Sequence, residues 1–227
     1  MVKHIFVINL DEAEDRWDEY KDDDRYTRWK ATHYEKLEPD DPIFKKMISY
    51  HNIDKKEHKA KCACFLSHTS LWKHIIKEDL KDVLILEDDA LLVNSIPKDL
   101  PTDGFTYLGG FTSNKRMTDG AKKVNFKKGI HLIDHSQYRM LMCLAIYIPN
   151  AYVAHKMLQS TETFTKRVKA IDTMIRMTHL NQYVSYPASF IEKPIDSQIR
   201  DKKKKFSNER YEWVSSKNLI KEYDLDN

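Results

Sequence analysis

Residues 83–90 read VLILEDDA, and this stretch decides the fold because four apolar residues end abruptly in three carboxylates. An uninterrupted apolar run suits a strand that is buried on both faces, as in a parallel sheet. Such sheets bind ligands beyond the carboxyl ends of their strands, where these carboxylates stand. Glu87, Asp88 and Asp89 repel one another and need a cation, hydrogen bonds or open water. The stretch therefore predicts either a Mg²⁺ or Mn²⁺ site that also holds substrate phosphates, or an ordinary acidic turn.

A helix is predicted immediately upstream. Residues 64–76 read CFLSHTSLWKHII, with apolar side chains at 65, 72 and 76 and at 71 and 75. This is helical spacing, and it predicts a helix over 63–78 that leads into a strand over 82–87.

The remaining elements alternate. Strands are expected at 4–10, 27–32, 106–110 and 140–148, a turn leading into a helix at 11–20, and helices at 43–50, 149–159 and 172–180. A polar, basic mobile loop or hairpin is expected over 111–130. Strands interleaved with helices favour an α/β layer fold.

Composition limits the alternatives. With 227 residues, of which 41% are hydrophobic, the chain can form one α/β domain over 1–227 with an irregular basic tail from about 201. Lys and Arg number 38 against 35 Asp and Glu, a net charge of +3 that does not predict nucleic-acid binding.

The length of the apolar runs and the spacing of the cysteines indicate where the protein is located. The N-terminal run turns polar at Asn9, too early for the core of a signal peptide, and nothing approaches a span of about 20 apolar residues. Cys62, Cys64 and Cys143 are odd in number and form no Cys-x-x-Cys pair. We therefore expect a soluble, cytoplasmic protein with reduced thiols and no integral membrane segment.

The order of these motifs resembles a known family. Ser-His-x-x-x-Trp, about a dozen polar residues and then Leu-Ile-Leu-Glu-Asp-Asp-Ala resemble the family 25 glycosyltransferases, which include lipopolysaccharide sugar transferases and collagen galactosyltransferases. The opening FVINLD at 6–11, with Arg16 after it, resembles the family's first strand and turn. The resemblance spans roughly residues 5 to 200. It implies the GT-A fold, a Rossmann-like domain with a mixed, mainly parallel central sheet.

The resemblance also implies an activity. Such enzymes move a hexose, galactose or glucose, from a UDP-sugar to a hydroxyl of a glycan, lipid-linked sugar or hydroxylated protein. Their Asp-x-Asp motif bridges Mn²⁺ (or Mg²⁺) to the diphosphate, and here Glu87 stands where the first Asp is usual. We expect Asp89 as a direct metal ligand and Glu87 as a metal or donor contact. Asp88 is assigned to the donor, on the opposite side of the strand.

An inverting transfer needs a base near the acceptor hydroxyl. Asp172 resembles the carboxylate at a helix start that serves as the base in many inverting GT-A enzymes. It also looks like an ordinary helix N-cap, and both interpretations stay open. Asp119 and Asp134 are weaker substitutes.

Further donor contacts follow from the resemblance. Asn9, Asp11 and Arg16 end the first strand, where GT-A enzymes hold the nucleotide, and Arg16 could pair with phosphate. Ser67 and His68 could orient the donor, although a hydrogen-bonded core histidine explains His68 equally simply. Residues 197–200, SQIR, resemble a loop that closes over the diphosphate.

Two other functions remain open. A metal-dependent phosphohydrolase could use the same acidic strand end but would need more carboxylates in comparable positions. A catalytically silent sugar-nucleotide binder would keep both motifs and transfer nothing.

Overall fold

The structure is a computed structural model that describes residues 1–37, 40, 45, 56–109, 128–133, 143–162 and 170–193. Its strands are β1 (His4–Asn9), β2 (Tyr26–Lys30), β3 (Val83–Glu87), β4 (Ala90–Leu92), β5 (Gly104–Tyr107), β6 (Gly129–Leu132), β7 (Ala145–Ile148), β8 (Asn181–Tyr186) and β9 (Phe190–Glu192). Its helices are α1 (Glu14–Trp17), the 3₁₀ helix η1 (Tyr34–Lys36), α3 (Lys56–Lys77), α5 (Ala151–Glu162) and α6 (Ile171–Arg176). Most of the predicted 43–50 helix and 111–130 loop, the 197–200 segment, the tail, Asp119 and Asp134 lie outside the described residues.

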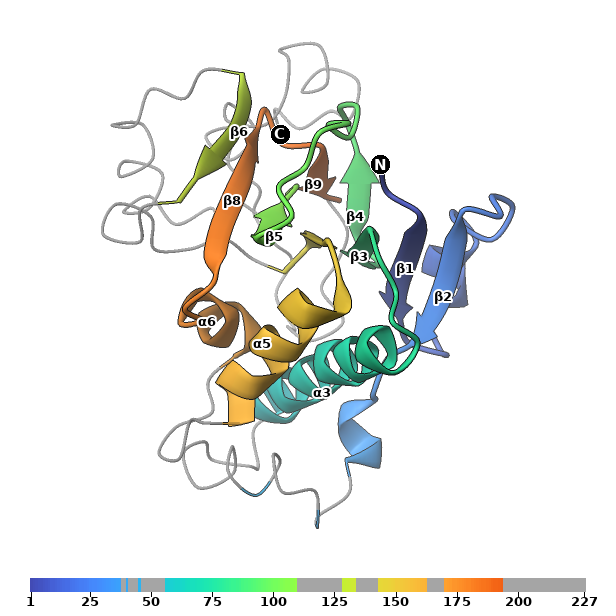
Figure 1. Cartoon of the computed structure of the whole chain (residues 1–227). Helices are drawn as coiled ribbons and strands as arrows, with labels where there is room; N and C mark the ends of the chain where they lie inside the picture. The colour runs from blue at the N-terminus through green and yellow to red at the C-terminus, as the bar shows by residue number, and fades with distance from the viewer. Residues whose placement is uncertain are drawn as a thin grey trace.

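Seven strands form one central sheet in the order β2-β1-β3-β7-β5-β8-β6 (Figure 1). Strands β2, β1, β3, β5 and β8 run in one direction, whereas β7 and β6 run in the opposite direction. The predicted α/β fold with a mixed, mainly parallel sheet is therefore confirmed.

Strand β3 is buried on both faces, as its continuous apolar run predicts. Val83 and Ile85 belong to the core cluster that includes Phe65 and Trp72 of α3. Leu84 and Leu86 belong to a second cluster on the other side of the sheet. Because the side chains alternate, Glu87 ends the strand on the helix side, and Asp88 comes next on the opposite side.

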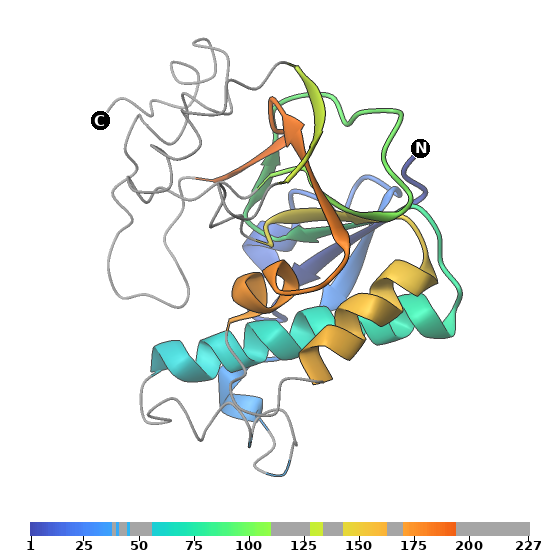
Figure 2. The same ribbon diagram turned by 60° about the vertical axis from the view of Figure 1, so that its left-hand side comes forward.

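Helices α3 and α5 lie side by side under one face of the sheet, with α6 beside them (Figure 2). The predicted 63–78 helix is longer than expected and begins at Lys56. Its Leu71, Trp72 and Ile75 are fully buried. This packing determines which side chains of α3 point toward the end of β3.

Several predicted boundaries are wrong. The turn expected at the start of 11–20 is present and the helix after it is confined to α1, whereas the helix expected over 172–180 ends at Arg176. The Gln182 side chain donates to the carbonyls of Ile175 and Arg176, and these bonds satisfy carbonyl groups at the C-terminal end of α6. The chain then continues as β8, a strand that was not predicted from the sequence.

A separate antiparallel pair, β4 with β9, follows the acidic segment. Gly109 is required for the close approach of β9, since a Cβ there would lie 2.6 Å from the Phe190 carbonyl oxygen. This pair returns the chain to the acidic segment at Lys193.

Candidate active site

A pocket of about 400 Å³ lies where β1 and β3 end, against α3. Six of the predicted site residues line it, namely Arg16, Ser67, His68, Glu87, Asp88 and Asp89. The rest of the wall comes from Ile8 of β1, from Leu10 and Glu12 after it, from residues 31–34 after β2, and from Lys56, Ala60, Ala63 and Cys64 of α3. The pocket thus combines acidic side chains with apolar and aromatic ones.

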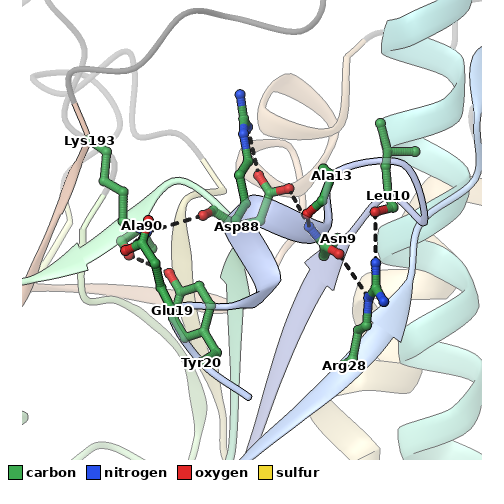
Figure 3. A network of polar contacts seen from close by, with 10 residues as sticks. Asn9, Leu10, Ala13, Glu19, Tyr20, Arg28, Asp88, Ala90 and Lys193 are labelled. Atoms are coloured by element: carbon green, nitrogen blue, oxygen red, sulfur yellow. Dashed lines mark hydrogen bonds and ion pairs between the residues drawn. The ribbon is translucent and has the colours of Figure 1, made fainter. Parts of the chain in front are cut away.

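Asp88 is held by two side chains from the N-terminal segment (Figure 3). Asn9 Nδ2 donates to one carboxylate oxygen at 2.8 Å, and Arg16 Nη1 donates to the other at 2.9 Å. The side chains of Arg16 and Asp88 are each 12% exposed, so this ion pair is largely withdrawn from water.

Asn9 is itself fixed from the opposite side. Its side-chain oxygen accepts from Arg28 Nε at 2.8 Å, and its amide also donates to the Ala13 carbonyl. Arg28 donates further to the Leu10 carbonyl at 3.0 Å. A continuous polar chain therefore runs from Arg28 through Asn9 to Asp88 (Figure 3), and Arg16 continues it from the other Asp88 oxygen. Arg28 was missed in the sequence because an arginine within a strand carries no local signal.

Lys193 holds the acidic segment from the C-terminal side. Its backbone N–H donates to the Asp89 carbonyl at 2.7 Å, and its ammonium group lies 2.7 Å from the Glu19 carboxylate. The ammonium also stands over the Tyr20 ring, whose hydroxyl donates to the Ala90 carbonyl. No local pattern in the sequence indicates this contact, because Lys193 lies more than 100 residues beyond Asp88.

Glu87 faces α3. Its Oε1 lies 3.3 Å from His68 Nε2 and 3.9 Å from Cys64 Sγ. Burial lowers the pKa of His68 to about 4, although the Asp172 carboxylate acts in the opposite direction. Burial also raises the pKa of the Cys64 thiol, and the Glu87 charge adds to this shift. At neutral pH His68 is therefore uncharged and Cys64 is protonated.

Ser67 connects α3 to the end of β2. Its hydroxyl accepts from the Thr32 N–H at 2.8 Å and donates to the Ala63 carbonyl at 2.8 Å. Ser67 thus fixes the chain after β2 against the pocket.

Asp172 and Asp11 are not among the pocket-lining residues of the described chain. Asp172 accepts from the Cys143 N–H at 2.9 Å, and the N-cap of α6 is Ala170, so the N-cap interpretation of Asp172 is wrong. Asp11 forms an ion pair with Lys30 at 2.5 Å, and this hydrogen bond lowers the pKa of Asp11.

The sequence matches a known enzyme family over nearly its whole length. A family profile described as "Glycosyltransferase family 25 (LPS biosynthesis protein)" matches residues 2–222. The chain belongs to glycosyltransferase family 25. This family 25 glycosyltransferase is therefore an enzyme that transfers sugars, as the resemblance implied. None of its described helices is long and apolar enough to cross a membrane.

A local similarity links part of this family 25 glycosyltransferase to curated proteins of another kind. They are the ubiquitin carboxyl-terminal hydrolases 36 of Drosophila sechellia and Drosophila simulans, each 34% identical over 83 residues. The match covers 34% of this chain, and the chain spans 8% of the length of these relatives. So small a share of the relatives carries no argument about activity.

Proposed function

We propose that this glycosyltransferase moves a hexose, galactose or glucose, from a UDP-sugar to a hydroxyl group with inversion, in lipopolysaccharide or related glycan synthesis. The acceptor is a glycan, a lipid-linked sugar or a hydroxylated protein. One observation carries the proposal: a largely buried arginine and three consecutive carboxylates line one pocket. An arginine suits phosphate, whereas carboxylates suit the cation that a diphosphate also binds.

Arg16 is the proposed diphosphate contact. Asp88 orients its guanidinium, a planar group with five N–H donors that lines the pocket. Because both Asp88 oxygens already accept bonds from protein groups, we assign Asp88 to positioning Arg16 rather than to the donor.

The carboxylates of Glu87 and Asp89 fit a hard divalent cation. Both line the pocket and offer the oxygen donors that Mn²⁺ and Mg²⁺ prefer. When bound, such an ion neutralises charge on the departing diphosphate. In this proposal Glu87 and Asp89 hold the ion, and Arg16 orients the phosphates beside it.

The apolar and aromatic lining of the pocket suits a nucleoside. Ile8 and Leu10 are apolar, and Tyr34 is an aromatic residue whose ring lies under the Lys56 ammonium. Ser67 fixes this wall through its bond to Thr32. In this proposal uracil and ribose lie toward β1 and β2, and the sugar lies toward α3.

Asp172 is the proposed base. It lies on the first turn of α6, is partly exposed, and is near enough to Cys64 and His68 for its charge to affect the pKa of both. As the acceptor oxygen attacks the anomeric carbon, its proton passes to Asp172 and the bond to the diphosphate breaks.

The test is incubation of the purified protein with a panel of nucleotide sugars, Mn²⁺ and candidate acceptors. We expect transfer from a UDP-hexose, with an inverted anomeric configuration by NMR. Release of free sugar or inorganic phosphate that is independent of every acceptor would favour a phosphohydrolase. UDP-sugar binding without turnover across the panel would favour the silent binder.

A further inference from the structure

Three side chains with metal-ligating atoms meet at the inner wall of the pocket. The ligating atoms of Cys64, His68 and Glu87 all lie within 4.8 Å of one another. The mechanism proposed above uses only Glu87 of the three. A thiol, an imidazole and a carboxylate form a donor set of different character from the oxygen-only set that Mn²⁺ and Mg²⁺ prefer.

The local fold brings these groups together. Cys64 and His68 are four residues apart on α3, so they stand one above the other on the same helix face. Glu87 reaches that face from the end of β3. The His68 side chain is fully buried and Glu87 is 28% exposed, so the cluster is anchored in the core and opens toward the pocket.

Two of the three separations between ligand atoms are close to those around a tetrahedral ion. Zinc bonds of about 2.0–2.3 Å to nitrogen, oxygen and sulfur place neighbouring ligand atoms about 3.3–3.8 Å apart. Glu87 Oε1 lies 3.3 Å from His68 Nε2 and 3.9 Å from Cys64 Sγ. Three protein ligands beside a cavity leave a fourth position for water or substrate.

We propose that Cys64, His68 and Glu87 form a binding site for a thiophilic divalent cation of the Zn²⁺ type. Binding breaks the S–H bond of Cys64, forms a sulfur–metal bond and releases the proton to solvent. The lone pair of His68 and the Glu87 carboxylate complete the protein ligands. Because Glu87 is shared, an ion here competes with the proposed Mn²⁺ and weakens UDP binding, and this second effect rests on the proposed function.

Cobalt is the direct probe of the site. The full chain, freed of metal by chelation, is titrated with Co²⁺, which reports thiolate ligation by a charge-transfer band in the near ultraviolet. We expect the band in the wild type, its loss in Cys64→Ser and its displacement by Zn²⁺. Cys143→Ala is the matched control, because Cys143 is a buried cysteine outside the cluster and the band must persist in that variant.

Calorimetry and circular dichroism complete the test. We expect Zn²⁺ affinity to fall by more than about 10-fold in Glu87→Gln, which keeps the side-chain shape, while the folded signal is retained. Absence of the cobalt band in the wild type, or its survival in Cys64→Ser, would overturn the proposed metal site. Cys64, His68 and Glu87 would then form a hydrogen-bonded cluster that binds no metal.

A last measurement separates the two proposals. With Mn²⁺ present, Zn²⁺ should weaken UDP binding in the wild type and much less in Cys64→Ser. A cobalt band without any UDP binding means that the proposed function fails and the metal site stands. UDP binding that Zn²⁺ leaves unchanged overturns the competition.

Discussion

Asp88 and Arg16 form an ion pair at 2.9 Å across 72 residues of sequence, at the edge of the pocket. Asp88→Ala should lower the free energy of unfolding by about 3 kcal/mol, because it removes a short ion pair from a largely buried guanidinium and a hydrogen bond from Asn9. Urea denaturation measures this. The exposed Asp18–Lys21 pair is the control, and Asp18→Ala should leave the unfolding midpoint unchanged. Equal midpoints for both variants would contradict the structural role of Asp88.

The same pair predicts non-additive effects on donor binding. Arg16→Ala should weaken UDP binding in the presence of Mn²⁺ by more than about 10-fold, since a charge-assisted contact is lost. If Asp88 acts through Arg16, the double variant with Asp88→Asn should bind UDP no more weakly than Arg16→Ala alone. Additive losses in calorimetry would show that Asp88 contacts the donor itself.

Asp89 should couple UDP binding to the metal. In Mn²⁺, Asp89→Asn should reduce UDP affinity by about 10-fold or more, because one carboxylate ligand becomes a neutral amide. With a chelator present, wild type and variant should bind UDP equally weakly. Calorimetry under both conditions gives the comparison, and equal affinities in Mn²⁺ would remove Asp89 from the metal site.

Asp172→Asn separates catalysis from folding. Asparagine retains an oxygen that can accept from the Cys143 N–H, so the thermal midpoint and the UDP affinity should stay close to wild type. Turnover should fall by about 10²-fold or more, because the amide cannot take the acceptor proton. A wild-type rate, or a product that retains the donor's anomeric configuration, would exclude Asp172 as the base.

His68 should make stability depend on pH in the metal-free protein. Its pKa is about 4 when folded and about 6.5 in a model peptide, so the unfolded chain binds a proton that the folded chain rejects in this window. Stability should therefore fall as pH decreases from about 6.5 to 4, by up to the order of 3 kcal/mol. Glu87, Cys64 and Asp172 surround the ring or act on it electrostatically.

The control for this prediction is His68→Gln. In the presence of a chelator, urea unfolding of both proteins across this pH range isolates the histidine, because the other titrating groups are common to both. Parallel pH profiles for the two proteins would show that His68 does not titrate on unfolding.

Residues 83–90 allowed much of the central fold to be predicted, because a strand buried on two faces needs apolar residues at every position. The helix before it was found from its spacing. Strand β8 was missed, since Gln182 and Ser185 are buried by pairing with strands distant in sequence and carry no apolar alternation. Its polar composition resembles that of a loop.

The candidate site was predicted in part. Motif order indicated Arg16, His68 and the three carboxylates, which do line one pocket. Local sequence could not show which groups each would bind. The pairing of Arg16 with Asp88 and the contact of Lys193 with Asp89 join segments far apart in the chain.

The two-sided burial of β3 also affects how the sheet aligns during folding. Displacing β3 by one residue against β1 would exchange Val83 and Ile85 with Leu84 and Leu86, and an apolar core would barely distinguish the two alignments. The same slip would send Asp88 toward α3 and break its bond to Asn9. The polar contacts of the pocket thus select the correct register of β3. Asn9→Leu would remove one of these contacts and allow misfolded chains in which β3 is out of register.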